Sequence, residues 1–486
     1  MYIRNEDTIC APATIPGTGA ISVIRVSGPE ALTIADKVIR CRKGSISGSE
    51  GYTIKFGTVH SPEGDIIDEV LVSVFCAPRS YTGENSVEIS CHASSFIVSS
   101  IMDMLYSAGA RAADPGEFTQ RAYLNGKMDL AQAEAVADVI ASQNAAAHRI
   151  AFKQMKGGFS SELRDMRSEL LELVSLMELE LDFSEEEVEF ADRSRLDGLL
   201  SELISHISRL IDSFKLGNAI KNGVPVAIAG ATNTGKSTLL NALLGEDRAI
   251  VSDVHGTTRD TIEETLNIDG VLFRFIDTAG LRETDEVVEK IGIERTFKKI
   301  SEASVVLGMI DLTRDYDSTC DTVREIIEKV DFTCQKLVIL LNKTDICEVN
   351  KNVSLVNYIV SLLDNKGIRT SLINTIENEA TDVPIIPISA KTGSGILDLR
   401  SILAASQRDL LGDSDTTLVT NQRHVQALTD SRASLLRVRD GLASGLPTDL
   451  AAQDIREAIY HLGSIVGEIS TDEVLGNIFR NFCIGK

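Results

Sequence analysis

The chain has 486 residues, which is too long for one hydrophobic core and predicts about three domains. It is 43% hydrophobic and 24% charged, as globular proteins are, and no stretch approaches about 18 apolar residues, so we expect a cytoplasmic protein with no membrane span. A formal net charge of −23 disfavours unaided binding of nucleic acid, so a nucleic-acid substrate would require a local basic patch or a basic partner.

Residues 1–125 contain short β-rich segments, such as AISVIRVSG and EVLVSVF, separated by Gly, Pro and Ser. This pattern predicts a mixed α/β domain. From Asp129 onward the apolar residues follow a helical period, which predicts a helical region over 126–220. The apolar positions of its first helix are Leu130, Ala133, Val136 and Ile140.

A long amphipathic helix is predicted between Leu196 and Phe214, where apolar residues recur at spacings of 4, 3, 4, 3 and 4. Such spacing is typical of a helix packed along a seam. Because the pattern lasts for less than about three heptads, a helix of a bundle is favoured over a free coiled coil.

Over residues 221–408 apolar strands alternate with helical stretches, which is typical of a doubly wound parallel sheet. Helical periodicity returns over 409–486. Because helical regions flank the α/β block on both sides, we predict that this block is inserted into one helical domain. The clearest periodic positions after the block are Ile455, Ile459, Leu462, Ile465, Val466 and Ile469.

The segment GATNTGKS, residues 230–237, follows the strand VPVAIAG and begins the helix STLLNALL, as a phosphate-binding P-loop does. In such a loop, backbone N–H groups bind phosphate oxygens, Lys236 reaches the β and γ phosphates, and Ser237 binds Mg²⁺. Lys236 is therefore also a candidate catalytic residue. The predicted nucleotide contacts here are Asn233, Thr234, Gly235, Lys236, Ser237 and Thr238.

Four further segments, HGTTRD, DTAG, NKTD and SAK, follow in the order found in the GTPase superfamily. In that superfamily the Asp of N-K-x-D accepts hydrogen bonds from guanine, so the resemblance implies GTP rather than ATP. The nucleotide-binding residues predicted in these segments are Thr257, Thr258, Asp277, Thr278, Ala279, Gly280, Asn342, Lys343, Asp345, Ser389, Ala390 and Lys391.

One position departs from Ras-type GTPases, which orient the attacking water with a Gln just after D-x-x-G. That position here is Leu281, whose side chain can neither donate nor accept a hydrogen bond. The loop that follows offers Glu283, Glu286 and Glu289, and no arginine finger is identifiable. We therefore expect the water to be positioned from elsewhere.

The chain ends on FCIGK, with Cys483 four residues from the terminal carboxylate. A prenylation box also has a cysteine at that position, but Gly and Lys in the last two places do not match it. The remaining interpretations are a buried core thiol and a mobile, chemically active one.

Several motifs together resemble one family over the whole chain: AISVIRVSG, SYTGEN, PGEFTQRAYLNGKMDLAQAEA, GTTRD, DTAGLRE, EVVEKIGIER and FCIGK. The sequence is similar to the MnmE/TrmE family of tRNA-modification GTPases. The resemblance implies a homodimer that, with the FAD-containing flavoprotein MnmG (GidA), adds an aminomethyl or carboxymethylaminomethyl group to C5 of the wobble uridine of certain tRNAs. It also implies an N-terminal domain that dimerises and binds 5-formyl- or methylene-tetrahydrofolate, the one-carbon source.

The resemblance implies a potassium site in place of the missing arginine finger. Held there, K⁺ counters the charge that builds between the β and γ phosphates. Glu289 matches the family's water-positioning acid and is a candidate catalytic residue. The metal ligands implied for K⁺ and Mg²⁺ together are Asn233, Ser237, Ser252, Val254 (by its backbone), Thr257 and Thr258.

For folate, the resemblance implies Arg25, Glu88, Lys127 and Lys486. We expect Glu88 to pair with the pterin N–H edge and the cations to suit the glutamate tail. Cys483 would then lie near the reacting one-carbon unit, as a nucleophile or as part of the pocket lining. Where the family usually has G-H-G-G, this chain has CHAS at residues 91–94. This difference concerns the pocket of the N-terminal domain, where the folate residues are predicted.

A second hypothesis is a regulatory GTPase that acts as a conformational switch in ribosome assembly. The GTPase motifs do not separate the two hypotheses. The N-terminal motifs and FCIGK favour the tRNA-modifying enzyme.

Overall fold

The structure is a computed structural model that describes residues 7–182, 193–245, 264–276, 300–347, 353–372, 383–407, 417–444, 448–469, 472–480, 482 and 485. The chain divides into two compact units. One comprises Met1–Ala141, Ala151–Ile211 and Gln422–Lys486, and the other comprises Ser142–Ile150 and Asp212–Asn421. The predicted GTPase domain over 221–408 falls within the second unit, and the exact domain bounds remain a prediction.

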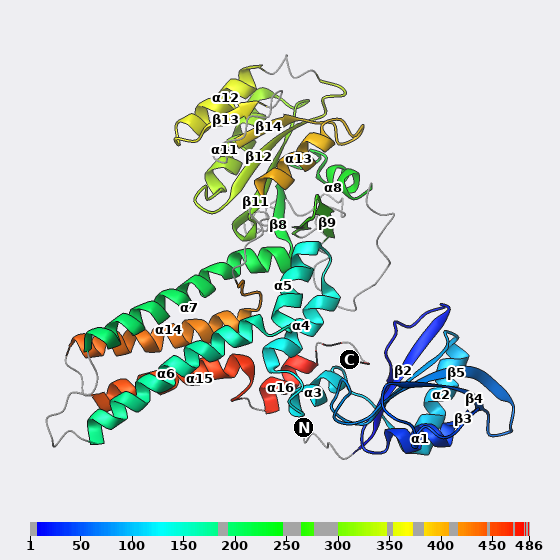
Figure 1. The fold of residues 1–486 in the computed structure, drawn as a ribbon. Coiled ribbons are helices and arrows are strands. Elements are labelled where there is room, and N and C mark those ends of the chain that lie inside the picture. Colours follow the sequence, from blue (N-terminus) through cyan, green and yellow to red (C-terminus); the bar gives the residue numbers. More distant parts are fainter. Residues whose placement is uncertain are drawn as a thin grey trace. The chain divides into compact units, whose positions relative to one another are not determined.

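The first unit begins with a seven-stranded sheet and three helices, shown in blue and cyan in Figure 1. The strands are β1 (Ile9–Pro12), β2 (Ile21–Ser27), β3 (Ile39–Cys41), β4 (Thr53–His60), β5 (Ile66–Phe75), β6 (Ser86–His92) and β7 (Arg111–Ala112), and the helices are α1 (Ala31–Val38), α2 (Ser95–Ala108) and α3 (Glu117–Leu124). The strand order is β3-β4-β5-β6-β2-β1-β7. The predicted strands in AISVIRVSG and EVLVSVF are β2 and β5, so the mixed α/β prediction is confirmed.

The two faces of this sheet are covered differently. Because side chains alternate along a strand, Ile24 and Val26 of β2 enter a core shared with α1 and α2, whereas Arg25 lies on the opposite face. Near β1 that opposite face is covered by α3, whose Phe118 is fully buried against Ile9.

Among the described residues, the helical regions contain seven helices. They are α4 (Leu130–Ala141), α5 (Ala145–Met155), α6 (Gly158–Asp182), α7 (Arg193–Asn222), α14 (Gln422–Ala443), α15 (Thr448–Val466) and α16 (Asp472–Phe479). Figure 1 shows α6, α14 and α15 packed side by side. Segments on either side of the GTPase motifs thus form one bundle, as predicted.

The predicted apolar seam is present in α7, although this helix is longer than the prediction. Its buried seam residues are Leu200, Leu203, Ile207 and Leu210. One predicted helical position is wrong: Ile469 lies beyond Val466, the last residue of α15. Ile140 lies in the last turn of α4, as predicted, and is half-exposed there.

The second unit contains a doubly wound sheet, which confirms the predicted fold class. Its elements are β8 (Val224–Ala229), α8 (Lys236–Gly245), β9 (Glu264–Ile268), β10 (Val271–Phe275), β11 (Val305–Asp311), α11 (Tyr316–Lys329), β12 (Lys336–Asn342), α12 (Val353–Asp364), β13 (Thr370–Leu372), β14 (Val383–Pro387) and α13 (Ile396–Ser406). The strand order is β13-β14-β12-β11-β8-β10-β9, and only the β9–β10 pair is antiparallel.

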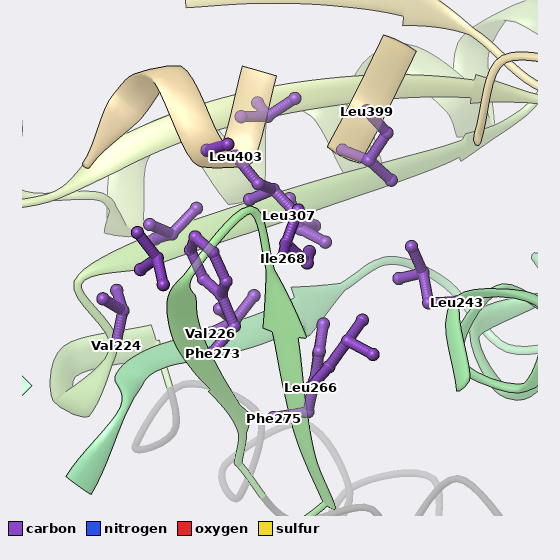
Figure 2. Close-up of a cluster of buried hydrophobic side chains, with 14 of the residues drawn as sticks. Val224, Val226, Leu243, Leu266, Ile268, Phe273, Phe275, Leu307, Leu399 and Leu403 are labelled. Carbon is purple, nitrogen blue, oxygen red and sulfur yellow. The ribbon is translucent and has the colours of Figure 1, made fainter. Parts of the chain in front are cut away.

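Each face of this sheet has its own apolar core. One core buries residues of α11 and α12, and the other buries residues of α8 and α13. Figure 2 shows the second core, in which Leu399 and Leu403 of α13 lie over β-sheet residues that include Leu307 and Phe273. Burial on both faces explains why the central strands are nearly continuous apolar runs. Among the described residues, no helix has the length and apolar character to cross a membrane.

Candidate GTP site and N-terminal polar site

The P-loop connects the buried strand β8 to the first turn of α8. Gly235 has a φ of +99°, and a Cβ at this position would lie 2.7 Å from Nδ2 of Asn342. A side chain would therefore be both strained and obstructed here. Asn233 has a φ of +60°, which is left-handed backbone that Asn tolerates better than most residues do.

The ammonium group of Lys236 lies within this loop. Its Nζ donates to the carbonyl oxygens of Gly230 at 2.9 Å and Ala231 at 2.8 Å. Ser237 and Thr238 follow in the first turn of α8, where helix N–H groups attract anions. The structure therefore brings together all six residues predicted for the phosphate-binding loop.

Asn342 joins the P-loop to the segments NKTD and SAK, which are predicted to recognise the base. Its Nδ2 donates to the carbonyl of Thr234 at 2.7 Å, and its Oδ1 accepts from the backbone N–H of Ala390 at 3.0 Å. The side chain is buried, so both hydrogen bonds satisfy polar atoms that would be costly to leave unpaired. NKTD and SAK thus meet at one edge of the sheet.

Asp345 is held by the second of these segments. Ser389 donates from Oγ to Oδ1 of Asp345 at 2.8 Å, while the backbone N–H of Thr344 donates to the carbonyl of Ile388 at 3.2 Å. A carboxylate fixed in this way is preorganised to accept from the two N–H donors of a guanine edge. Lys391, the last residue of SAK, is exposed.

Sequence reasoning missed Asp311, which supports the same edge. Lys343, with a φ of +71°, places its Nζ 2.6 Å from Oδ2 of Asp311. Burial would raise the pKa of Asp311, but the hydrogen bonds from Lys343 and Thr313 outweigh it and hold the pKa below its usual value. The position of Asp311 could have indicated this role. It is the last residue of β11, which pairs with β8, the strand that leads to the P-loop.

Arg314 was also missed. Its Nη2 donates to the carbonyl of Thr232 in the P-loop, and its Nε lies 4.0 Å from Oδ2 of Asp311. The loop after β11 therefore contacts the P-loop and, through Asp311, Lys343 of the NKTD segment.

Several predicted residues lie outside the part of the chain that the structure describes. They are Ser252, Val254, Thr257, Thr258, Asp277, Thr278, Ala279, Gly280, Glu289, Cys483 and Lys486.

In the N-terminal domain, Arg25 and Glu88 form a cross-strand pair between β2 and β6. Arg25 donates to Oε1 of Glu88 from Nε at 3.0 Å and from Nη2 at 2.9 Å. Its guanidinium carbon lies 5.2 Å from the ring centre of Tyr81 and 5.6 Å from that of Phe118. Two predicted folate residues are thus in direct contact, and aromatic rings hold the arginine in place.

Lys127 contacts the loop that carries Tyr81. Its Nζ donates to the carbonyl of Pro78 at 3.0 Å, and its side-chain carbons lie 3.4 Å from where a Cβ of Gly83 would be. Lys127 therefore adjoins the Arg25 site through this loop.

The CHAS replacement leaves ordinary backbone at residues 93 and 94. Ser94 has φ −102° and ψ 132°, and among the described residues neither Ala93 nor Ser94 has positive φ. Since neither position requires glycine, Ala and Ser introduce no backbone strain.

Comparisons with known proteins match these observations. The family model for the MnmE helical domain matches residues 130–483, and the one for the GTP-binding protein TrmE N-terminus matches residues 8–127. The tRNA modification GTPases MnmE of Parabacteroides distasonis and Bacteroides thetaiotaomicron are each 50% identical, over 483 and 486 residues. In both cases the match covers 99% of this chain and 100% of the relative. That of Flavobacterium johnsoniae is 48% identical, with the same coverage. The chain belongs to the MnmE family of tRNA modification GTPases.

Proposed function

We propose that the chain is the GTP-hydrolysing subunit of a cytoplasmic complex that modifies C5 of the wobble uridine in certain tRNAs. The observation that carries this proposal is the presence of two polar sites in one chain. One is organised around Asn342 in the GTPase unit, and the other is the Arg25–Glu88 pair in the N-terminal domain.

At the GTP site, the described residues fit a guanine nucleotide with Mg²⁺. Asp345 would accept from guanine, the loop N–H groups and Lys236 would bind phosphates, and Ser237 would bind the metal. The bound Mg²⁺ would neutralise phosphate charge during hydrolysis. Lys236 must exchange its two carbonyl partners for phosphate oxygens when the nucleotide binds.

Potassium stimulation is part of the proposal. Asn233 has left-handed backbone, which Asn tolerates better than most residues do. Its side-chain oxygen would be a ligand of K⁺. The other proposed K⁺ ligands are Ser252, Val254 and Thr257. The cation would supply the positive charge of an arginine finger, and Glu289 would orient the water that Leu281 cannot bind.

The N-terminal site fits a reduced folate. Both hydrogen bonds from Arg25 to Glu88 end on Oε1, so Oε2 is the oxygen proposed to accept from the pterin N–H edge. Lys127 and Lys486 would bind the carboxylates of the glutamate tail. Folate would supply the one-carbon unit, with Cys483 beside it.

The sheet face that carries these residues also supports a homodimer. Cross-strand pairing aligns Ile54, Ser73, Glu88 and Arg25 in one row. Ile54, Phe56 and Leu71 on this face are 68%, 40% and 49% exposed, which is unusual for large apolar side chains. We propose that a second copy covers them. Phe56→Glu should give monomers in analytical ultracentrifugation, whereas Leu397→Glu, at an exposed site in the other unit, should not.

We further propose that the flavoprotein MnmG, with its FAD, is the partner in a heterotetramer. Because this chain carries a net charge of −23, such a partner would supply the positive surface that binds tRNA.

Mass spectrometry of wobble uridines decides between this function and a switch in ribosome assembly. Cells that lack the protein should lose the C5 modification. Intact modification together with immature ribosomal subunits would favour the switch.

A further inference from the structure

Gly485 occupies a close-fitting site at the end of β1, which we call its seat. Gly485 is buried with a φ of +95°, and a Cβ there would lie 2.3 Å from the carbonyl oxygen of Pro12 and 3.1 Å from Cα of Ala13. Nη1 of Arg25 also donates to the carbonyl of Gly485 at 3.4 Å. The steric fit therefore requires glycine, and the long hydrogen bond is a secondary contribution.

A second seat lies three residues earlier in the chain. Gly116, with a φ of +70° just before α3, would place a Cβ 2.7 Å from the carbonyl oxygen of Phe479 and 2.9 Å from Cβ of Phe482. The ring centres of Phe479 and Phe482 are 5.3 Å apart, and Phe479 is buried with Leu130 of α4. Phe482 is thus held between α16 and the start of α3.

We propose that Gly485 and Gly116 are positioning residues for the modification reaction. They hold the two ends of segment 482–485, to which Cys483 belongs by sequence. The inference rests on the proposed folate chemistry, in which that thiol serves the one-carbon unit. Holding Phe482 and Gly485 in place beforehand removes conformational freedom of these two residues that would otherwise be lost at the moment of reaction.

The seats are tested by hydrogen exchange of the full-length chain. Gly485→Ala and Gly116→Ala should each accelerate amide exchange in the C-terminal peptide by about tenfold or more, because the terminus is released. Gly476→Ala is the matched control: Gly476 lies in α16, has no atom within 4 Å of an added Cβ and has no left-handed backbone. Unchanged exchange in Gly485→Ala would overturn the inference.

A second measurement tests the functional part. With the flavoprotein partner, Gly485→Ala should lose most wobble modification while kcat for GTP hydrolysis and the KM for GTP stay at wild-type values. Full modification by a chain whose terminus exchanges rapidly would show that the seats do not position the reaction. Absence of modification by the wild-type chain would instead reject the proposed function, and the exchange result would stand independently.

Discussion

The side-chain amide of Asn342 donates to the carbonyl of Thr234, 108 residues away in the chain, at 2.7 Å. This hydrogen bond joins the P-loop to the segment that is proposed to recognise the base. Gly235 lies directly beside it, since a Cβ there would approach the same nitrogen to 2.7 Å.

Gly235→Ala should therefore weaken GDP and GTP binding by roughly tenfold or more, because the loop must shift and the Asn342 bond must break. Titration with a fluorescent guanine nucleotide measures this. Gly245→Ala, at the last residue of α8, is the control, because an added Cβ meets no atom within 4 Å there. Equal affinities in the two variants would contradict the assigned role of Gly235.

Asp345→Asn should shift the base preference from guanine to xanthine. The mutant side chain presents an N–H where the carboxylate accepted hydrogen bonds, and xanthine presents an oxygen where guanine has its 2-amino group. Competition between GTP and xanthosine triphosphate measures the shift. Unchanged GTP affinity would remove Asp345 from the base site.

GTP hydrolysis should be faster in K⁺ than in Na⁺ at equal ionic strength. Glu289→Ala should lower kcat while leaving nucleotide affinity nearly unchanged, because its proposed interaction acts mainly in the transition state. Steady-state hydrolysis assays test both parts. A rate indifferent to the cation rejects the potassium site, and normal turnover by the mutant rejects Glu289.

Cys483→Ser should fold, dimerise and hydrolyse GTP as the wild type does, yet fail to support wobble modification. We expect this result because the thiol is proposed to act at the folate site, where serine cannot replace a thiolate as a nucleophile. Mass spectrometry of tRNA from complemented cells measures the outcome. Full modification would make the thiol a bystander, and a large loss of thermal stability would make it a core residue.

Glu134, a buried carboxylate in the helical region, should make the stability of the fold depend on pH. Glu134 of α4 accepts from His424 at 2.6 Å and from Nη2 of Arg423 at 2.9 Å. Burial alone would raise the pKa of Glu134, but these two partners lower it from the usual 4.5 to about 2. Because the folded-state pKa is depressed, the stabilisation is present above pH 4.5 and is lost as the pH falls towards 2, and it amounts to roughly 3 kcal/mol.

Glu134→Gln should accordingly lower the midpoint of thermal unfolding at pH 7, and its deficit against the wild type should shrink at pH 3.5. Glu69→Gln, which changes an exposed carboxylate, is the control. A deficit that stays constant across this range would contradict the charged state assigned to Glu134.

The sequence determined the features that depend on neighbouring residues. The P-loop, the seam of α7 and the apolar strands of the second sheet follow from local spacing, because the periods of helices and strands are properties of the backbone. The position of Ile469 was misjudged because a helix end depends on packing that the period does not contain.

Only the tertiary structure decided which distant residues meet. Asp311 with Lys343, Glu134 with His424, and Gly485 with Pro12 are contacts between separate elements. Each contact forms because folding buries polar atoms that must be paired or backbone that must be closely packed. No local sequence pattern identifies the partner residue. The sequence alone could therefore place the GTP site on its motifs, whereas the contacts of Phe482 and Gly485 depend on how β1, α3 and α16 pack together.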